Sequence, residues 1–149
     1  MEDFRNCVWA CPAPSHPWHS FINNVPAHLT VASYLNSPRA AKSVFDSIKR
    51  SVRIRLVGPV VATETNGFCA LTVRVFPVDG HLPAWWPVNA HVSFAYRYNH
   101  PYEDGDVEAL ENALTRVPRT AELVVLRSAA ASGHFHDWRI LDSKSVGEL

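Results

Sequence analysis

Hydrophobic and polar residues alternate in two short stretches of the chain that resemble each other. Residues 27–32 read Ala-His-Leu-Thr-Val-Ala, and residues 90–95 read Ala-His-Val-Ser-Phe-Ala. Since successive side chains of a β-strand point to opposite faces, the histidine and the hydroxyl residue of each stretch share one face. The pattern therefore predicts two strands, at 26–34 and 90–98, each with one polar and one apolar face. The four polar residues are His28, Thr30, His91 and Ser93.

Apolar patterning predicts further strands along the chain. They are expected at 4–10 (as an edge strand), 52–57, 60–65, 68–76, 122–127 and 136–141. Asn66-Gly67 is a strong signal for a hairpin turn between two of them. The proline-rich stretches 11–19 and 77–89 predict loops, and Ser132-Gly133 predicts a turn.

Two helices are predicted from apolar residues that recur three and four positions apart. The first begins at Ser37-Pro38, where serine caps the helix and proline takes the first helical position. Lys49 and Arg50 are expected in its last turn, where the helix dipole favours cations. The second helix follows Asp104-Gly105-Asp106 and ends at Pro118.

The two histidine strands belong to an internal repeat with an offset of 63 residues. Beyond the histidines and hydroxyls, an Ala, an Asn and a Pro coincide, and a helix and further strands follow each time. We therefore expect an α+β fold of two pseudo-symmetric β-α-β halves, with antiparallel sheets lining a central cleft and helices outside. The halves span about 20–76 and 88–142, with the loop 77–89 between them, and the two histidine pairs face each other across the cleft.

Composition narrows the setting. The chain of 149 residues is 47% hydrophobic and 19% charged, which is typical of one globular domain, residues 1–149. We expect no membrane span, no signal peptide, a monomer and, from three cysteines, a reducing cytoplasmic compartment. A formal net charge of zero argues against binding long duplex nucleic acid but permits a small nucleotide or oligonucleotide.

Two histidines and two hydroxyls on polar faces that meet across one cleft point to phosphate chemistry. Imidazole titrates near neutrality, so a pair of imidazoles can act as acid and base without a metal or another cofactor. The hydroxyls of Thr30 and Ser93 can donate to the non-bridging oxygens of a phosphate. The residues do not distinguish which histidine is the acid and which the base.

On these motifs, the chain resembles the two-histidine (2H) phosphoesterase superfamily over about residues 20–142. That group includes the bacterial RNA 2′,5′ ligase-like (LigT-like) proteins, plant and fungal cyclic nucleotide phosphodiesterases, and viral 2′,5′-phosphodiesterases. In its short length and motif spacing the chain is most similar to compact viral members and to phage proteins that destroy cyclic oligonucleotide signals. It departs from the commoner pattern at Ser93, where threonine is more frequent.

The resemblance implies a metal-independent phosphodiesterase that cleaves 2′-linked nucleotides. The substrate would be 2′,5′-oligoadenylate or a cyclic dinucleotide such as 2′,3′-cGAMP, and cleavage would blunt a nucleotide-based immune response. One alternative is processing of RNA ends that carry 2′,3′-cyclic phosphates. An alternative of another class is a non-catalytic nucleotide-binding domain on the same fold.

Several aromatic and basic residues are candidates for substrate binding, because aromatic rings stack on any base. Tyr34 and Arg97 fall on the histidine faces of their strands if the alternation continues, and the others lie in loops near the motif strands. The candidates are Tyr34, Arg97, Trp18, Trp86 and Tyr102, with Trp85 beside them.

A metal site is a weaker alternative. Cys7, Cys11, His16 and His19 could in principle bind a metal, but the spacing of the histidines is far shorter than in a zinc finger. His134 and His136 are expected at a turn. The polar segment 142–149 is expected to fray.

Overall fold

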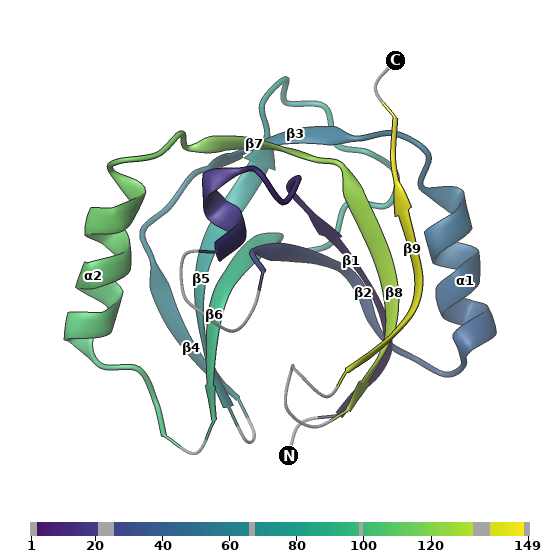
Figure 1. Cartoon of the computed structure of the whole chain (residues 1–149), viewed down its shortest axis with the longest axis horizontal. Helices are drawn as coiled ribbons and strands as arrows, with labels where there is room; N and C mark the ends of the chain where they lie inside the picture. Colours follow the sequence, from purple (N-terminus) through teal and green to yellow (C-terminus); the bar gives the residue numbers. More distant parts are fainter. Residues whose placement is uncertain (1–2, 21–25, 66–67, 99, 133–137, 148–149) are drawn as a thin grey trace.

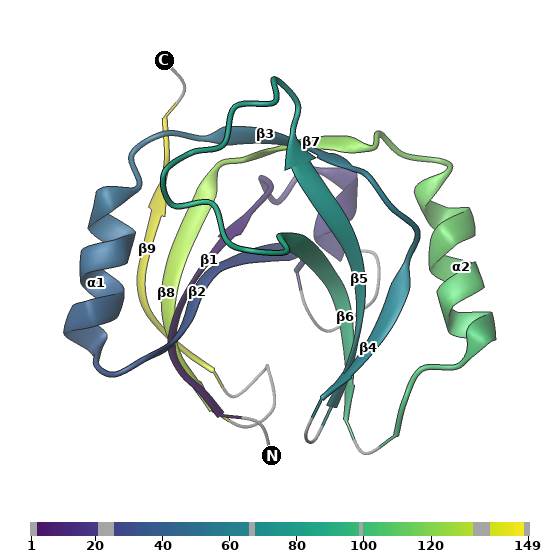
Figure 2. The same ribbon diagram turned by 180° about the vertical axis from the view of Figure 1, so that it is seen from behind.

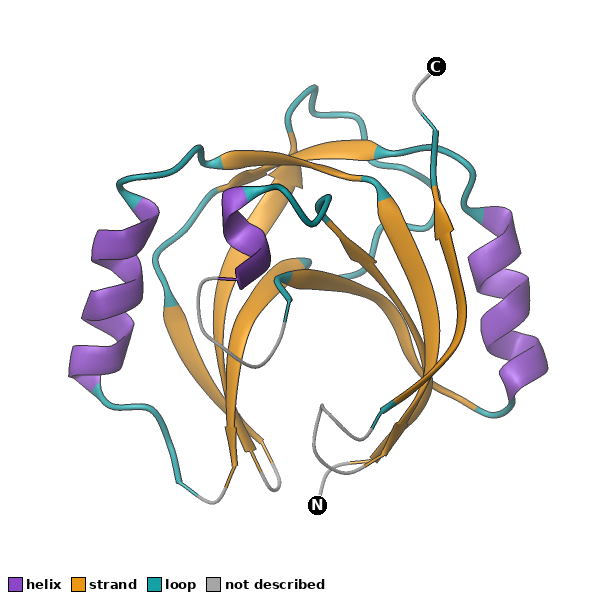
Figure 3. Cartoon of the chain, viewed as in Figure 1, coloured by secondary structure: helices purple, strands orange, loops and turns teal. Residues whose placement is uncertain are grey.

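The protein is a curled antiparallel sheet of nine strands with two α-helices on its outside (Figures 1 and 3). The computed structural model describes residues 3–20, 26–65, 68–98, 100–132 and 138–147. The predicted α+β class, the antiparallel pairing and the outer position of the helices are confirmed. The elements are β1 (Asp3–Cys11), η1 (Pro17–Ser20), β2 (His28–Leu35), α1 (Pro38–Ser47), β3 (Val52–Leu56), β4 (Val61–Thr65), β5 (Phe68–Pro77), β6 (His91–Tyr98), α2 (Asp104–Leu114), β7 (Thr120–Leu123), β8 (Val125–Ser132) and β9 (Arg139–Ser145).

The two histidine strands, β2 and β6, are neighbours in the middle of the sheet. The strand order is β7-β3-β5-β6-β2-β1-β8-β9, and β4 pairs with β5. His28 lies opposite Ser93 in the antiparallel pair of β2 and β6, and β3 pairs with β7 in the same way. Corresponding strands of the two halves thus pair with each other, as a twofold axis through the sheet requires. The motifs therefore lie side by side in one sheet and not on opposite walls of a cleft.

Both predicted helices form, and each has a side-chain cap. The Ser37 hydroxyl accepts from the backbone N–H of Ala40 at 3.1 Å, and Pro38 opens α1. Helix α2 starts one residue after Glu103, whose N–H donates to the Asp106 carboxylate at 2.9 Å in a capping box. Helix α1 ends at Ser47, so Lys49 and Arg50 lie beyond the helix. The prediction that they occupy its last turn is wrong.

The apolar face of the sheet packs against the helices and forms the main core. Phe45 of α1 and Leu110 of α2 are buried there with Leu29 and Phe94 of the motif strands. Figures 1 and 2 show α1 and α2 on opposite flanks of the curled sheet, so neither of them covers its inner face. The polar residues of the motif strands point to that inner face.

The ends of the chain differ from the prediction. Strand β1 is not an edge strand, because it pairs with β2 on one side and with β8 on the other. The predicted strand 122–127 is divided between β7 and β8. The segment after residue 141 continues β9 to Ser145, and Val146 is buried, so pairing with β8 orders a stretch that its polar composition alone would leave free.

Two predictions concern residues outside or at the limits of the described chain. The turn residues Asn66-Gly67 lie outside it, but β4 and β5 pair up to Thr65 and Phe68, as a hairpin requires. Gly133 also lies outside it.

In the described parts, no helix is long and apolar enough to cross a lipid bilayer.

The cap of α1 gives a test of the fold. We expect Ser37→Ala to lower the free energy of unfolding by about 1 kcal/mol, because the N–H of Ala40 loses its acceptor. Ser43→Ala, at an exposed position in the same helix, is the control and should change stability by less than about 0.5 kcal/mol. Urea denaturation of both variants checks this, and equal effects would contradict the capping role.

Candidate active site

A pocket of about 250 Å³ opens on the inner face of the sheet, around the two motif strands. Thr30, His91 and Ser93 line it, so the structure brings three of the four predicted motif residues together. The fourth, His28, lies behind the pocket wall and is completely buried. The remaining lining residues are Cys7, Ser33, Thr63, Phe68, Ala70, Thr72, Tyr96 and Trp138.

His28 is held by hydrogen bonds on both ring nitrogens. Nδ1 lies 2.8 Å from the carbonyl oxygen of Pro26, which can only accept, so Nδ1 carries the proton. Nε2 lies 2.8 Å from the hydroxyl of Tyr96 and accepts from it. Trp9 packs on the ring edge to face, with centroids 4.8 Å apart. Burial lowers the pKa of His28 from 6.5 to about 4, so the ring is neutral at pH 7.

His91 has the same anchor but a different environment. Its Nδ1 lies 3.0 Å from the carbonyl oxygen of Asn89, two residues earlier, just as Nδ1 of His28 bonds Pro26 two residues earlier. In both motifs the backbone thereby fixes which nitrogen is left for other partners, namely Nε2. His91 is exposed at the pocket, whereas His28 is buried. The two histidines are therefore tethered in the same way but differ in their access to solvent.

A β-bulge follows the hydroxyl residue in strand β2. Consecutive residues of β1 pair with Thr30 and Ala32, so Val31 is an extra residue. The bulge reverses the alternation and turns Ser33 into the pocket. Tyr34, predicted to share the face of His28, has a positive φ of 59° and an exposed side chain that does not line the pocket.

Strand β6 has the matching bulge. Consecutive residues of β5 pair with Ser93 and Ala95, so Phe94 is the extra residue and Tyr96 takes the next inner position. Arg97 is thereby moved off the face of His91 that the sequence assigned to it. It lies 3.2 Å from the Asp106 carboxylate of α2 and over the ring of Tyr102, 4.4 Å from its centroid.

The five predicted substrate-binding residues all lie outside the inner pocket. Trp18 is a core residue: it is fully buried against Phe94, and its indole N–H donates to the carbonyl of Pro118 at 2.9 Å. The ring of Tyr102 packs against the guanidinium of Arg97, and burial raises the pKa of Tyr102 to about 12. Trp86 belongs to the loop before β6, where it packs partly against the main core beside Trp85.

Tyr96 is the site residue that the sequence pattern misses. Its hydroxyl donates to Nε2 of His28, and the Ser93 hydroxyl is hydrogen-bonded to it. Burial raises its pKa, so the phenol stays protonated near neutrality. The hydroxyl therefore lies between the buried histidine and the pocket. Tyr96 reaches the inner face only because of the bulge at Phe94, and the apolar pattern of the sequence does not reveal that bulge.

The metal-site alternative finds no support among the described residues. Burial raises the pKa of both Cys7 and Cys11 to about 12, so neither is a ready thiolate. His16 accepts from the N–H of Trp18 at 3.1 Å and lies 3.2 Å from the carbonyl of Thr120. Within the described ranges, no three His, Cys, Asp or Glu side chains gather in a metal-binding group. The side chain of His19, and His134 and His136, lie outside them.

Comparison with known proteins identifies the fold. No protein-family model matches the sequence, and no curated protein is significantly similar to it. Among solved structures the chain is similar to Usb1 from Kluyveromyces marxianus, with a TM-score of 0.51 and 14% identity over 94% of this chain and 98% of Usb1. The structure of that Usb1 with uridine monophosphate gives a TM-score of 0.50 and 13% identity, over 93% and 98% of the two chains. The likeness shows that this chain has the fold of Usb1, a curled antiparallel sheet with two helices.

The lowered pKa of His28 predicts how stability depends on pH. Between pH 6.5 and about 4 the unfolded chain binds a proton at His28 that the folded chain does not, so stability is complete above pH 6.5 and falls as the pH drops toward 4. We expect this residue to account for a loss of up to about 3 kcal/mol. Denaturation of the wild type and of His28→Gln at pH 7 and pH 4.5 measures it. An equal loss in both proteins would contradict the neutral, buried state of His28.

Proposed function

We propose that the chain is a metal-independent phosphodiesterase that cleaves phosphodiesters next to a ribose hydroxyl. The observation that carries the proposal is the pairing of His28-x-Thr30 with His91-x-Ser93 around one pocket, with each Nδ1 tied to a backbone carbonyl. The fold shared with Usb1, of which one structure contains uridine monophosphate, supports a nucleotide as the ligand.

The two histidines have different environments, which suggests different roles. His28 is neutral, and its Nε2 is a hydrogen-bond acceptor, so it is suited to take up a proton. Because His28 is fully buried, the proton reaches it through Tyr96: a substrate hydroxyl donates to the Tyr96 oxygen as the phenolic proton moves to Nε2. The negative charge of a bound phosphate favours protonated His28. His91, open to the pocket, then donates to the leaving oxygen.

The hydroxyl groups supply the remaining stabilisation. Thr30 and Ser93 come from adjacent strands and line the same pocket. Thr30 can donate to a non-bridging oxygen of a phosphate there, and Ser93 can do the same once its hydroxyl turns from the Tyr96 oxygen to the phosphate. Lysine and arginine are absent from the lining among the described residues, so neutral donors and His91 would hold the anion. Such donors are most effective where charge builds up in the transition state.

For the substrate we propose a 2′-linked nucleotide. In a 2′,5′ linkage, as in 2′,5′-oligoadenylate or a cyclic dinucleotide such as 2′,3′-cGAMP, the neighbouring 3′-hydroxyl attacks and leaves a 2′,3′-cyclic phosphate. Destruction of such signals would blunt an immune response. The second candidate is hydrolysis of 2′,3′-cyclic phosphates at RNA ends, with water as the nucleophile, and the uridine monophosphate in one Usb1 structure supports a ribonucleotide ligand. The pocket of about 250 Å³ is small, which suits a phosphate and one adjoining nucleoside.

Substitution of either histidine tests the catalytic site. We expect His28→Ala and His91→Ala each to lower kcat at least a hundredfold, because each removes one proton-transfer group. The assay offers 2′,5′-oligoadenylate, a uridine 2′,3′-cyclic phosphate and a cyclic dinucleotide side by side with excess chelator, and circular dichroism checks folding. His100→Ala, at an exposed histidine outside the pocket, is the control. Tight nucleotide binding without turnover of any substrate would instead indicate a non-catalytic nucleotide-binding domain.

Removal of one hydroxyl tests the route through Tyr96. We expect Tyr96→Phe to lower kcat at least tenfold with little change in KM, because Nε2 of His28 loses its link to the pocket. Tyr98→Phe is the matched control on the same strand and should keep wild-type turnover. Steady-state kinetics with the best substrate decide the matter. If Tyr96→Phe is as active as Tyr98→Phe, His28 does not act through this hydroxyl.

A further inference from the structure

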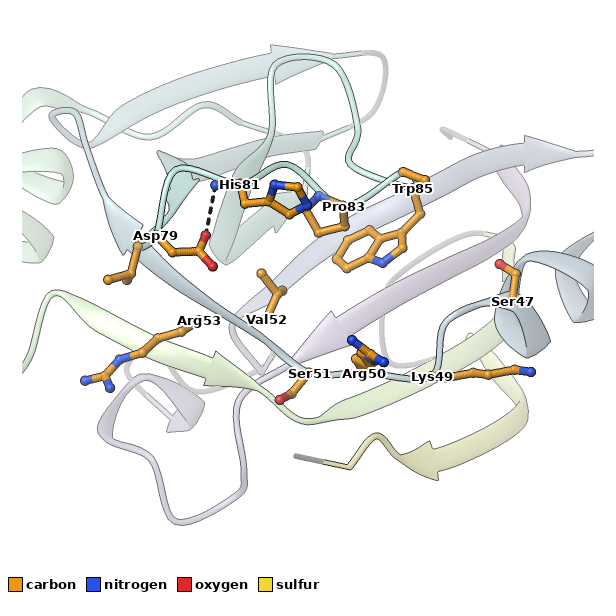
Figure 4. Close-up of a pocket in the computed structure, with 12 residues that line it drawn as sticks. Ser47, Lys49, Arg50, Ser51, Val52, Arg53, Asp79, His81, Pro83 and Trp85 are labelled. Carbon is orange, nitrogen blue, oxygen red and sulfur yellow. Dashed lines mark hydrogen bonds between the residues drawn. The ribbon is translucent and has the colours of Figure 1, made fainter. Parts of the chain in front are cut away.

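A second and larger cavity lies outside the inner pocket and shares no lining residue with it. It is a groove of about 660 Å³ between the segment 47–53, which joins α1 to β3, and the loop 78–85 before β6. Figure 4 shows Pro83 and Trp85 of the loop facing Val52 of β3, with Lys49, Arg50 and Arg53 along the opposite edge. We call this cavity the basic groove.

The cations of the basic groove are available to a ligand. Lys49, Arg50 and Arg53 are exposed, and none of them forms an ion pair with a described residue. The C-terminal end of α1 attracts cations, but Lys144 already donates to the Phe45 carbonyl there at 2.8 Å. The helix end therefore does not account for Lys49 and Arg50. Asp79 is the only acidic residue of the lining among the residues that the structure describes, and its carboxylate accepts from the backbone N–H of His81 at 2.9 Å.

The loop wall of the groove is held in place before any ligand binds. The N–H of Val78 donates to the carbonyl of Arg53 at 2.8 Å, which ties the loop to β3. The N–H of Trp86 donates to the carbonyl of Pro83 at 3.0 Å, and the rings of Trp85 and Trp86 lie 5.9 Å apart. Trp85 is half-buried and lines the groove, so part of its ring surface is open.

From this arrangement we infer that the basic groove binds a single-stranded segment of an oligonucleotide substrate, outside the scissile phosphate. Three cations spaced along one edge suit successive backbone phosphates, and the indole of Trp85 suits one stacked base. The groove is also linked to the site, because its loop continues through Asn89, whose carbonyl anchors His91. The inference rests on the proposed function and narrows it to substrates longer than a mononucleotide.

Direct binding tests the groove without relying on turnover. The probe is a fluorescently labelled ten-nucleotide oligouridylate, and its Kd for the full chain is measured by anisotropy at low and high salt. We expect the double variant K49A/R50A to bind at least tenfold more weakly, with a shallower dependence on salt, because two phosphate contacts are lost. Trp85→Ala should weaken binding at least fivefold, and Trp85→Phe should restore most of it. The matched control R39A/R116A removes two exposed cations outside the groove and should bind as the wild type does.

Kinetics separate this inference from the proposed function. For a uridine 2′,3′-cyclic mononucleotide we expect kcat and KM of K49A/R50A to stay within twofold of wild type, because that substrate does not reach the groove. His91→Ala should lose turnover but bind the oligouridylate more tightly than K49A/R50A does, because its basic groove is intact. Equal affinity of K49A/R50A and R39A/R116A for the oligouridylate would overturn the inference while leaving the catalytic proposal intact. The inference would also be overturned if K49A/R50A raised KM for the mononucleotide by the same factor as Kd for the oligouridylate.

Discussion

The antiparallel pair of β2 and β6 places His28 beside Ser93, and the candidate site depends on that register. Two motifs 63 residues apart in the chain become adjacent in the middle of a nine-stranded sheet. A slip of one residue would send every polar side chain of one strand into the apolar core behind the sheet. That core contains Leu29 and Val92, a directly paired couple between the motif residues, so the packing of the opposite face fixes the register of the site.

The tethers on the histidines make the two motifs chemically unequal. Each Nδ1 is bound to a carbonyl two residues earlier, which fixes the ring position at the cost of one nitrogen. Burial then keeps His28 neutral, with a pKa near 4, and leaves Nε2 as an acceptor covered by the Tyr96 hydroxyl. His91 has no such cover and meets the pocket directly. A duplicated strand thus gives two imidazoles with the same orientation toward their own backbones and different access to a ligand.

The parts of the structure that the sequence predicts are those governed by local periodicity. The alternation around His28 and His91 places the motif residues on the correct faces, and the Ser37 cap marks the start of α1 correctly. The errors begin directly after the hydroxyl residues of the two motifs. There a β-bulge adds one residue to each strand, Val31 in β2 and Phe94 in β6, and the alternation of the sequence does not show it. They remove Tyr34 and Arg97 from the predicted face and put Ser33 and Tyr96 in their place. Strand neighbours are equally hidden, because long-range pairing decides that β1 is an interior strand.

A crystal structure of the chain with uridine monophosphate tests the central claim most directly, since it shows where a phosphate binds relative to both motifs. The account predicts the phosphate in the inner pocket, with Nε2 of His91 and the hydroxyls of Thr30 and Ser93 within about 3.2 Å of its oxygens and the Tyr96 hydroxyl beside them. A nucleotide whose phosphate lies away from these four groups while the pocket stays empty would contradict it.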